Sequence, residues 1–339
     1  MEHRFPWRWS LADLPEPEQD APTVFSCFSC GGGSSMGYKR AGFRVLGCCE
    51  IDPEIFRVYD ANLQPDRGYV MDVREFAALG HYPEALRGLD VLDGSPPCST
   101  FSMAGDREKA WGVEKRFAEG QKKQRLDDLF FAFLDVAERL RPKVIVAENV
   151  EGLVMGKARG YVREIAGRMR ELGYAPQLFV LDASRMGVPQ ERRRAFFVAN
   201  RMGWPPLRMG FDERPVTFGE CKTEHVGERL TDRTAALVSA LRPGETSLKK
   251  ACMRLEGKAK RFNETVCWDW LVPKTLTASA VPIRMPEGAR VSERDVLNMA
   301  TFPQDYAAPK GRAQFLAGMS VPPSMMANVA AAMRDQWPL

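Results

Sequence analysis

The sequence predicts an α/β protein with a doubly wound, mostly parallel sheet and a second, smaller irregular domain. Three observations support this fold class. Strand-like and helix-like segments alternate through the first 200 residues, the short apolar strands end in glycine or acidic residues, and the alternation stops after Gly203. Alternation of this kind is typical of parallel sheets with helices on both faces.

The predicted strands are short apolar or β-branched runs, at residues 23–29, 43–49, 90–93, 143–147, 177–182 and 194–200. Helices are expected between them, where apolar residues recur at helical spacing or a proline opens the segment, at residues 36–41, 53–62, 126–140 and 161–172. Two further helices are expected near the C-terminus, at residues 292–302 and 324–334. The last one follows two prolines, which favour a helix start.

Changes in composition predict the domain boundaries. Residues 1–20 are polar and proline-rich, and we expect an N-terminal arm rather than a secretory signal. Residues 204–289 are rich in proline, glycine and charge, so the α/β domain would comprise residues 21–203 and 290–339. No run of about 18 apolar residues occurs, and no membrane partner is expected.

Charge and cysteine content limit the function classes. The net charge of +4 does not indicate a nucleic-acid partner by itself, but residues 107–125 carry seven Lys/Arg against three Glu, and residues 249–261 carry six against one. Such runs are either solvated faces or contacts for a polyanion. Eight cysteines without a signal indicate a reducing compartment. Cys27 and Cys30 form a CxxC without nearby histidines, so no metal is expected.

The stretch VLDGSPPCSTFS, residues 91–102, combines a buried strand with a stiff loop. Its two prolines fix two φ angles and remove two backbone donors. Cys98 therefore follows a rigid loop at the end of a strand, where open α/β sheets bind their ligands. Cys98 is either a nucleophile held in place or a small buried residue beside a turn.

Further chemistry-bearing residues follow other predicted strands. The glycine-rich turn of residues 28–37 would let a ligand approach the backbone closely, and Glu50 at the next strand end suits the ribose hydroxyls of a nucleoside cofactor. Glu148 follows the run KVIVA, as a helix cap or as a general acid. In the segment QERRR, strand alternation places Arg192 and Arg194 on one face. Two guanidiniums there suit an anion or a base carbonyl, unless they form a solvated edge.

Taken together, these motifs resemble the carbon-5 cytosine DNA methyltransferase family, in that family's motif order. The resemblance rests on the FxGxGG-like turn, PPC, ENV, QxRxR, RVSERDVLNMATFPQDY and GMSVPP. It covers the chain except the N-terminal arm and residues 204 to about 270. It implies a Rossmann-like, S-adenosylmethionine-dependent fold, in which residues 204–289 are the target-recognition domain.

The resemblance implies transfer of a methyl group from S-adenosylmethionine to carbon-5 of a flipped cytosine in double-stranded DNA. Cys98 resembles the nucleophile that adds to carbon-6, Glu148 the protonated acid that contacts N3, and Arg192 and Arg194 the active-site arginines. The cofactor pocket would be formed by Phe28, Ser29, Cys30, Gly31, Gly32, Gly33, Glu50, Ile51, Asp72, Val73, Pro96, Leu129, Ser320 and Val321.

The resemblance further implies a cytoplasmic monomer of a bacterium, archaeon or phage, acting alone or beside a cognate restriction endonuclease. Residues 107–125 would close over the flipped nucleotide, and residues 249–261 would contact the DNA backbone. Three departures affect the cofactor contacts. Ser26-Cys27-Phe28 stands where the family often has Asp-Leu-Phe, Cys30 takes a usual glycine position, and Met319 replaces the usual asparagine.

Three alternatives stay open at this point. The first is an RNA cytosine-5 methyltransferase of the same fold, although a transfer-RNA member would need little recognition domain. The second is a catalytically inactive DNA-binding protein, for which Cys98, Glu148 or Arg194 would be lost, yet all three are present. The third is a redox or zinc protein acting through the CxxC motif.

Overall fold

The computed structural model describes residues 3–97, 128–155, 159–258 and 263–339. By its internal contacts the chain forms two compact units. The first, called here the α/β unit, comprises Pro15–Leu181, Arg193–Met209 and Val329–Leu339. The second, called the small-sheet unit, comprises Met1–Leu14, Asp182–Arg192 and Gly210–Asn328. A target-recognition domain at residues 204–289 stays a prediction.

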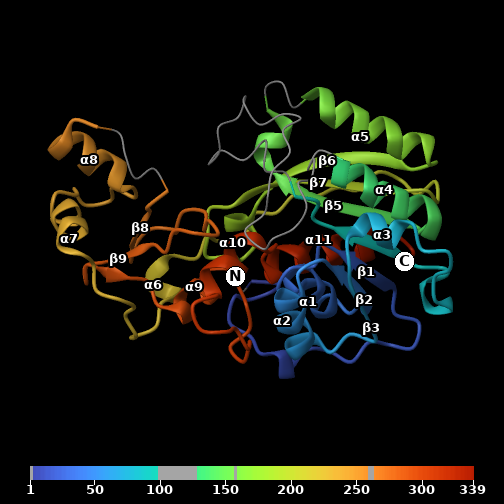
Figure 1. Ribbon diagram of the computed structural model, residues 1–339, viewed down its shortest axis with the longest axis horizontal. Helices are drawn as coiled ribbons and strands as arrows, with labels where there is room; N and C mark the ends of the chain where they lie inside the picture. The colour runs from blue at the N-terminus through green and yellow to red at the C-terminus, as the bar shows by residue number, and fades with distance from the viewer. Residues whose placement is uncertain (1–2, 98–127, 156–158, 259–262) are drawn as a thin grey trace. The chain divides into compact units, whose positions relative to one another are not determined.

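A sheet of seven strands runs through the described part of the α/β unit, in the order β3-β2-β1-β4-β5-β7-β6 (Figure 1). Strands β1 to β5 pair in parallel, whereas β7 runs antiparallel to β5. The predicted doubly wound, mostly parallel sheet is therefore confirmed. The strands are β1 (Thr23–Cys27), β2 (Arg44–Glu50), β3 (Arg67–Val70), β4 (Val91–Gly94), β5 (Val144–Val150), β6 (Ala175–Asp182) and β7 (Arg193–Asn200).

The order of strands reverses at the middle of the sheet. From β1 the chain continues to β2 and β3 on one side, whereas β4, the other neighbour of β1, leads to β5 on the opposite side. The register pairs Ser26 of β1 with Cys48 of β2 and with Asp93 of β4. In open α/β sheets, ligands bind outside the carboxyl ends of the strands at such a reversal. The ends of β1 and β4 are therefore the expected position of the site.

Helices cover both faces of this sheet. A buried cluster packs α3, α4 and α5 against one face, through strand residues such as Phe25, Leu92 and Ile145. Because side chains alternate along a strand, Ser26 and Asp93 point to the other face, where α1 lies. The helices of the unit are α1 (Gly33–Arg40), α2 (Pro53–Leu63), α3 (Val73–Ala77), α4 (Leu129–Leu140), α5 (Arg159–Glu171), the 3-10 turns η2 (Glu84–Leu86) and η4 (Glu151–Val154), and the C-terminal part of α11 (Pro323–Gln336).

Two of these helices begin at acidic residues that follow strands. The Asp52 carboxylate accepts hydrogen bonds from the backbone N–H groups of Glu54 and Ile55, and Asp72 accepts one from Arg74. Each cap satisfies donors that a helix start leaves without an intrahelical partner. Pro53 at the first position of α2 has no N–H to satisfy. The caps thus fix how the chain turns after β2 and β3.

The small-sheet unit contains a three-stranded sheet in the order β10-β9-β8, as far as its residues are described. The N-terminal segment contacts the chain near Thr301, since Trp9 is buried and its indole donates to the Thr301 carbonyl at 2.8 Å. The elements of this unit are β8 (Val266–Trp268), β9 (Ile283–Met285), β10 (Ala289–Arg290), α6 (Phe218–Cys221), α7 (Asp232–Ser239), α8 (Leu248–Glu256), α9 (Glu293–Met299), α10 (Ala313–Met319), the 3-10 turns η1 (Leu11–Asp13) and η6 (Ala183–Arg185), and the start of α11. Across the described ranges, no helix is long and apolar enough to cross a membrane.

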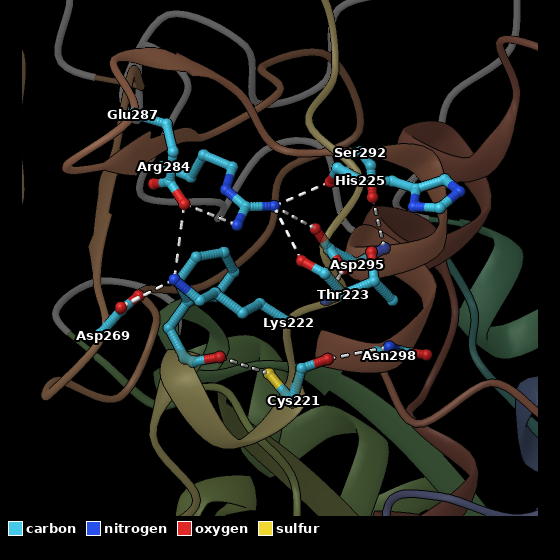
Figure 2. Close-up of polar contacts among 11 residues, drawn as sticks. Cys221, Lys222, Thr223, His225, Asp269, Arg284, Glu287, Ser292, Asp295 and Asn298 are labelled. Atoms are coloured by element: carbon cyan, nitrogen blue, oxygen red, sulfur yellow. Dashed lines mark hydrogen bonds and ion pairs between the residues drawn. The ribbon is translucent and has the colours of Figure 1, made fainter.

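A buried guanidinium organises the small-sheet unit (Figure 2). The Arg284 side chain on β9 is 2% exposed and pairs with Asp295 of α9 at 3.2 Å and with Glu287 at 2.8 Å. It also donates to the backbone carbonyls of Thr223 and His225, at 3.1 and 2.7 Å. One side chain therefore holds together a strand, a helix and the segment that follows α6.

We expect Arg284→Ala to destabilise the small-sheet unit severely. The change leaves the fully buried Asp295 carboxylate without its guanidinium, and breaking such a pair costs about 3–5 kcal/mol. The free energy of unfolding from urea titration measures the loss. Arg214→Ala is the matched control, because its bidentate pair with Glu220 lies at the surface and should matter little. Equal losses in the two variants would contradict the role given to Arg284.

Candidate active site

The turn between β1 and α1 has an unusual backbone. Phe28 and Cys30 adopt positive φ angles of 55° and 44°, and Gly32 adopts 84°. A Cβ atom on Gly32 would lie 2.4 Å from a methyl carbon of Leu63, so only glycine fits there. Left-handed backbone at non-glycine residues is strained and concentrates at ligand sites. The sequence prediction of a ligand turn at this position is consistent with that geometry.

The carboxylate of Glu50 supports this turn from the end of β2. One oxygen accepts the Cys30 N–H at 2.9 Å, and the other accepts the N–H groups of Ile51 and Asp52 at 2.8 and 3.1 Å. Burial raises the pKa of Glu50, and the three backbone donors oppose that shift. A carboxylate has about four acceptor positions, so Glu50 retains capacity for a ligand hydroxyl.

The other predicted cofactor residues of this unit lie at neighbouring strand ends. Asp72 follows β3 and caps α3, and the Pro96 residue follows β4. Val73 and Leu129 are 4% and 5% exposed and belong to the core cluster, and their place in the cofactor pocket stays a prediction.

The described part of the PPC loop is tied to the end of β5. The Asn149 side-chain amide donates to the Pro96 carbonyl at 3.1 Å, and Asn149 is 4% exposed. The Ser95 N–H donates to the Cys27 carbonyl at 3.4 Å, which extends the β1–β4 pairing by one bond. The chain leading to Cys98 is therefore fixed from both sides. Cys98 itself and the basic segment 107–125 lie outside the described residues.

Glu148 and Arg194 form an ion pair at the same edge of the sheet. Arg194 Nε lies 2.8 Å from a carboxylate oxygen of Glu148, and their side chains are 12% and 11% exposed. Register explains the contact, because Glu148 of β5 lies opposite Phe196 of β7 and Val150 lies opposite Arg194. Burial lowers the pKa of Arg194, and the Glu148 carboxylate opposes that change. The structure thus brings together two of the predicted catalytic residues.

Arg192 lies in the small-sheet unit and has a different environment. It is 1% exposed, and its guanidinium donates to the backbone carbonyls of Leu276, Gly318 and Ser320 at 3.0 to 3.3 Å. Strand β7 begins only at Arg193, so strand alternation does not extend to Arg192. The predicted cofactor residues Ser320 and Val321 also belong to this unit and are buried.

Metal ligation has no support in the part of the chain that the structure describes. No group of three His, Cys, Asp or Glu side chains there is arranged to hold a metal ion. Cys27, Cys48 and Cys49 are buried beneath the glycine-rich turn, and burial raises the pKa of each thiol. These thiols are packed as small apolar groups.

Asp93 is a buried polar residue of the site that sequence reasoning missed. It is 2% exposed, and its oxygens accept hydrogen bonds from Ser26 at 2.7 Å and Tyr38 at 3.4 Å. Burial, together with the nearby Glu148 charge, raises its pKa to about 6. The available signal was an acidic residue at an inward position of an apolar strand.

We expect Asp93→Asn to stabilise the fold at pH 8. Raising the pKa of Asp93 from 3.8 to about 6 means that the ionised carboxylate destabilises the folded state by roughly 3 kcal/mol. The neutral amide of asparagine avoids most of this cost. Since the folded state binds the proton first, wild type regains stability as the pH falls from about 6 to 4. The free energy of unfolding of Asp93→Asn, measured by urea titration, should therefore exceed that of wild type by about 1–2 kcal/mol at pH 8. The difference should vanish near pH 4.

Asp90→Asn provides the matched control for this measurement. Asp90 lies directly before β4, but it pairs with Lys143 at 2.6 Å and accepts two hydrogen bonds from Thr23. Loss of its charge should destabilise the protein at pH 8. If Asp93→Asn also destabilised it at pH 8, the cost assigned to the buried carboxylate would be wrong.

Comparison with curated proteins gives relatives of one kind. The chain is 34% identical over 187 residues to the type II methyltransferase M1.HphI of Haemophilus parahaemolyticus, covering 53% of this chain and 46% of that protein. It is 25% identical over 328 residues to the type II methyltransferase M.AplI of Arthrospira platensis, covering 93% of this chain and 86% of that protein. The chain thus spans about half the length of M1.HphI and most of M.AplI.

Solved structures show the same fold. A candidate DNA modification methyltransferase encoded within an Escherichia coli prophage superimposes with a TM-score of 0.68 at 18% identity, over 93% of this chain and 99% of that one. A mutant of Spodoptera frugiperda DNMT2 superimposes with a TM-score of 0.67 at 16% identity, over 93% of this chain and 100% of that one. The profile of the family described as C-5 cytosine-specific DNA methylase matches residues 23–232, which is more than half of the sequence. The chain therefore belongs to the C-5 cytosine-specific DNA methylase family.

Proposed function

We propose that the protein is a DNA (cytosine-5-)-methyltransferase that uses S-adenosylmethionine and a covalent Cys98 adduct. The observation that carries the proposal is the Glu148–Arg194 pair beside the Asn149–Pro96 bond, at the strand ends where the PPC loop begins. A carboxyl group, a guanidinium and the approach to a cysteine converge at one edge of the sheet. Membership of the family gives the reaction class to which such a set belongs.

Cytosine needs a nucleophile because its carbon-5 is too electron-poor to take a methyl group unaided. The Cys98 thiolate would add to carbon-6 and make carbon-5 enamine-like. Carbon-5 would then take the methyl group, with S-adenosylhomocysteine as the leaving group. Loss of the carbon-5 proton and expulsion of the thiolate from carbon-6 would release the methylated base. Cysteine suits both steps, since it is a strong nucleophile and a good leaving group. The target base must leave the DNA stack to reach it.

Glu148 would donate a proton to cytosine N3 while negative charge builds on the ring. Arg194 holds the Glu148 carboxyl at 2.8 Å and would contact the base or its phosphate through its remaining donors. Arg192 would act at a distance from the base, because its guanidinium is committed to backbone carbonyls. We therefore assign Arg194 to the substrate and Arg192 to positioning of the small-sheet unit.

The strand ends of the α/β unit fit S-adenosylmethionine. The Phe28 ring is partly buried against the core and offers a face to a cationic sulfonium, and the Glu50 carboxylate retains acceptor capacity for ribose hydroxyls. The left-handed turn at Cys30 and Gly32 lets a ligand approach the backbone. When bound, S-adenosylmethionine supplies an electrophilic methyl group. Asp72 and Pro96 would complete the pocket from β3 and β4.

Double-stranded DNA would be the macromolecular partner, with the recognition residues in the predicted domain 204–289. The described part of its basic run includes Lys249, Lys250 and Arg254 on α8. Arg254 pairs with Glu245 at 2.6 Å, so its charge is partly neutralised and Lys250 is better placed for a phosphate contact. A cognate restriction endonuclease is the expected protein partner, as the relatives are named type II methyltransferases.

Transfer of tritium from methyl-labelled S-adenosylmethionine to a mixed-sequence duplex tests the proposal. We expect label on cytosine carbon-5 within a defined recognition sequence, and no label with Cys98→Ala. A duplex carrying 5-fluorocytosine at the mapped site should trap a covalent adduct, because fluorine cannot leave as the proton does. Label on RNA but not on duplex DNA would overturn the DNA assignment and favour an RNA methyltransferase.

Substitutions at Glu148 test its role as the acid. Glu148→Gln keeps the length of the side chain and a donor for N3, so some methyl transfer should persist. Glu148→Asp withdraws the carboxyl by one methylene from both Arg194 and the base, and should lose more activity, by about tenfold or more. Glu151→Gln is the control, because Glu151 pairs with the partly exposed Arg193 at 3.1 Å. Equal losses for Gln and Asp at position 148 would contradict the acid role.

A further inference from the structure

Among the described residues, only hydroxyl groups donate hydrogen bonds to the Asp93 carboxylate. Ser26 and Tyr38 donate to its two oxygens at 2.7 and 3.4 Å. Within the described residues no Lys or Arg forms an ion pair with it, although it is 2% exposed. A buried carboxylate without a cation is costly to maintain, so a role other than stability is the simplest reason for it.

The partners of Asp93 come from both sides of the glycine-rich turn. Ser26 lies on β1, two residues before Phe28, and is the register partner of Asp93. Tyr38 lies on α1, the helix that directly follows the turn. Asp93 itself lies on β4, five residues before Cys98. A single carboxylate therefore joins the two ends of the predicted cofactor turn to the strand that leads to the predicted nucleophile.

Glu148 is electrostatically coupled to the same group. Asp93 is the register partner of Val146 on β5, and Glu148 follows Val146 by two residues, which places it on the same face of the sheet. Among the described residues, the other titratable side chains that interact with Asp93 are Cys27, Tyr38 and Tyr59, and burial raises the pKa of all three, so they stay neutral. Glu50 follows Cys48, the register partner of Ser26, by two residues and also lies on that face, but Glu148 is the carboxylate whose charge raises the pKa of Asp93.

We propose that Asp93 is a positioning residue of the methyl-transfer site, whose carboxylate fixes the glycine-rich turn relative to the start of the Cys98 loop. The inference rests on the proposed function. The ionised carboxylate accepts from both hydroxyls at once, one on each oxygen, whereas an amide has one acceptor oxygen and a donor group that makes at least one hydroxyl turn away. The arrangement is therefore complete only while Asp93 is charged.

The proposal predicts a pH-dependent loss that a purely structural residue would not show. Since burial raises the pKa of Asp93 to about 6, the wild type becomes like Asp93→Asn below that pH. Wild type should transfer the methyl group about ten times faster than Asp93→Asn at pH 8, because a factor of about ten corresponds to one lost hydrogen bond. The ratio should approach one at pH 5.

Ser26→Ala is the second variant, and it keeps the carboxylate. Without the Ser26 hydroxyl, which stabilises the charged form, the pKa of Asp93 rises further, so transfer should begin to fall at a higher pH than in wild type. Asp90→Asn is the control, since Asp90 touches none of these residues, and its transfer ratio to wild type should not change with pH. The three variants are compared with methyl-labelled S-adenosylmethionine and duplex DNA from pH 5 to 8.5.

Binding of S-adenosylmethionine to the free enzyme, measured by calorimetry, separates this proposal from the proposed function. Asp93→Asn should weaken binding several-fold at pH 8 and not at pH 5. If wild type binds the cofactor but transfers no methyl group, the proposed function fails and the binding data still decide the role of Asp93. The positioning role would be overturned if Asp93→Asn transferred methyl groups and bound S-adenosylmethionine as wild type does at every pH. A pH profile of Ser26→Ala identical to that of wild type would also overturn it.

Discussion

The parallel pairing of β1 with β4 is the constraint on which the site depends. These neighbours end at the same edge, but the chain leaves them toward opposite halves of the sheet. The glycine-rich turn and the PPC loop are therefore brought together by hydrogen bonding between strands, although about 60 residues separate them. The β5 strand pairs with β4 in the same direction and adds Glu148 and Asn149 to that edge.

The antiparallel strand β7 gives the site its guanidinium. A parallel strand at this place would present its carboxyl end beside the carboxyl end of β5, whereas the antiparallel β7 presents its amino end there. Its first residues therefore lie opposite Glu148-Asn149-Val150, so that Arg194 meets Glu148 and Arg193 meets Glu151. Two consecutive arginines thus serve two different carboxylates.

Much of the α/β fold could be predicted from the sequence, because strands buried on both faces leave apolar runs and their ends carry polar groups. Strand β3 and helix α3 were not predicted, since β3 is an exposed edge strand without alternating apolar residues. Strand β5 continues beyond the expected Ala147 through Glu148, because pairing with β7 outweighs the polarity of the residues. The elements within residues 204–289 are too short for their periodicity to be visible.

The site was predictable where motifs coincide with strand ends, as at Glu50, Glu148 and Arg194. The carbonyl environment of Arg192 was not, because it is formed by residues more than 80 positions away. Asp93 was missed for a related reason: its neighbours are hydroxyl groups, whose positions depend on register and helix placement and leave no motif.

The buried Asp93 carboxylate has a consequence for anyone who evolves this enzyme in the laboratory. A library sorted by folding yield or heat resistance would reward neutral residues at position 93, since burial of the charged carboxylate there opposes folding. Stabilised descendants selected in this way would have lost the proposed link between the glycine-rich turn and the start of the Cys98 loop. A stability assay would record that loss as an improvement. Selection on the product, applied in parallel, would keep the charge in place.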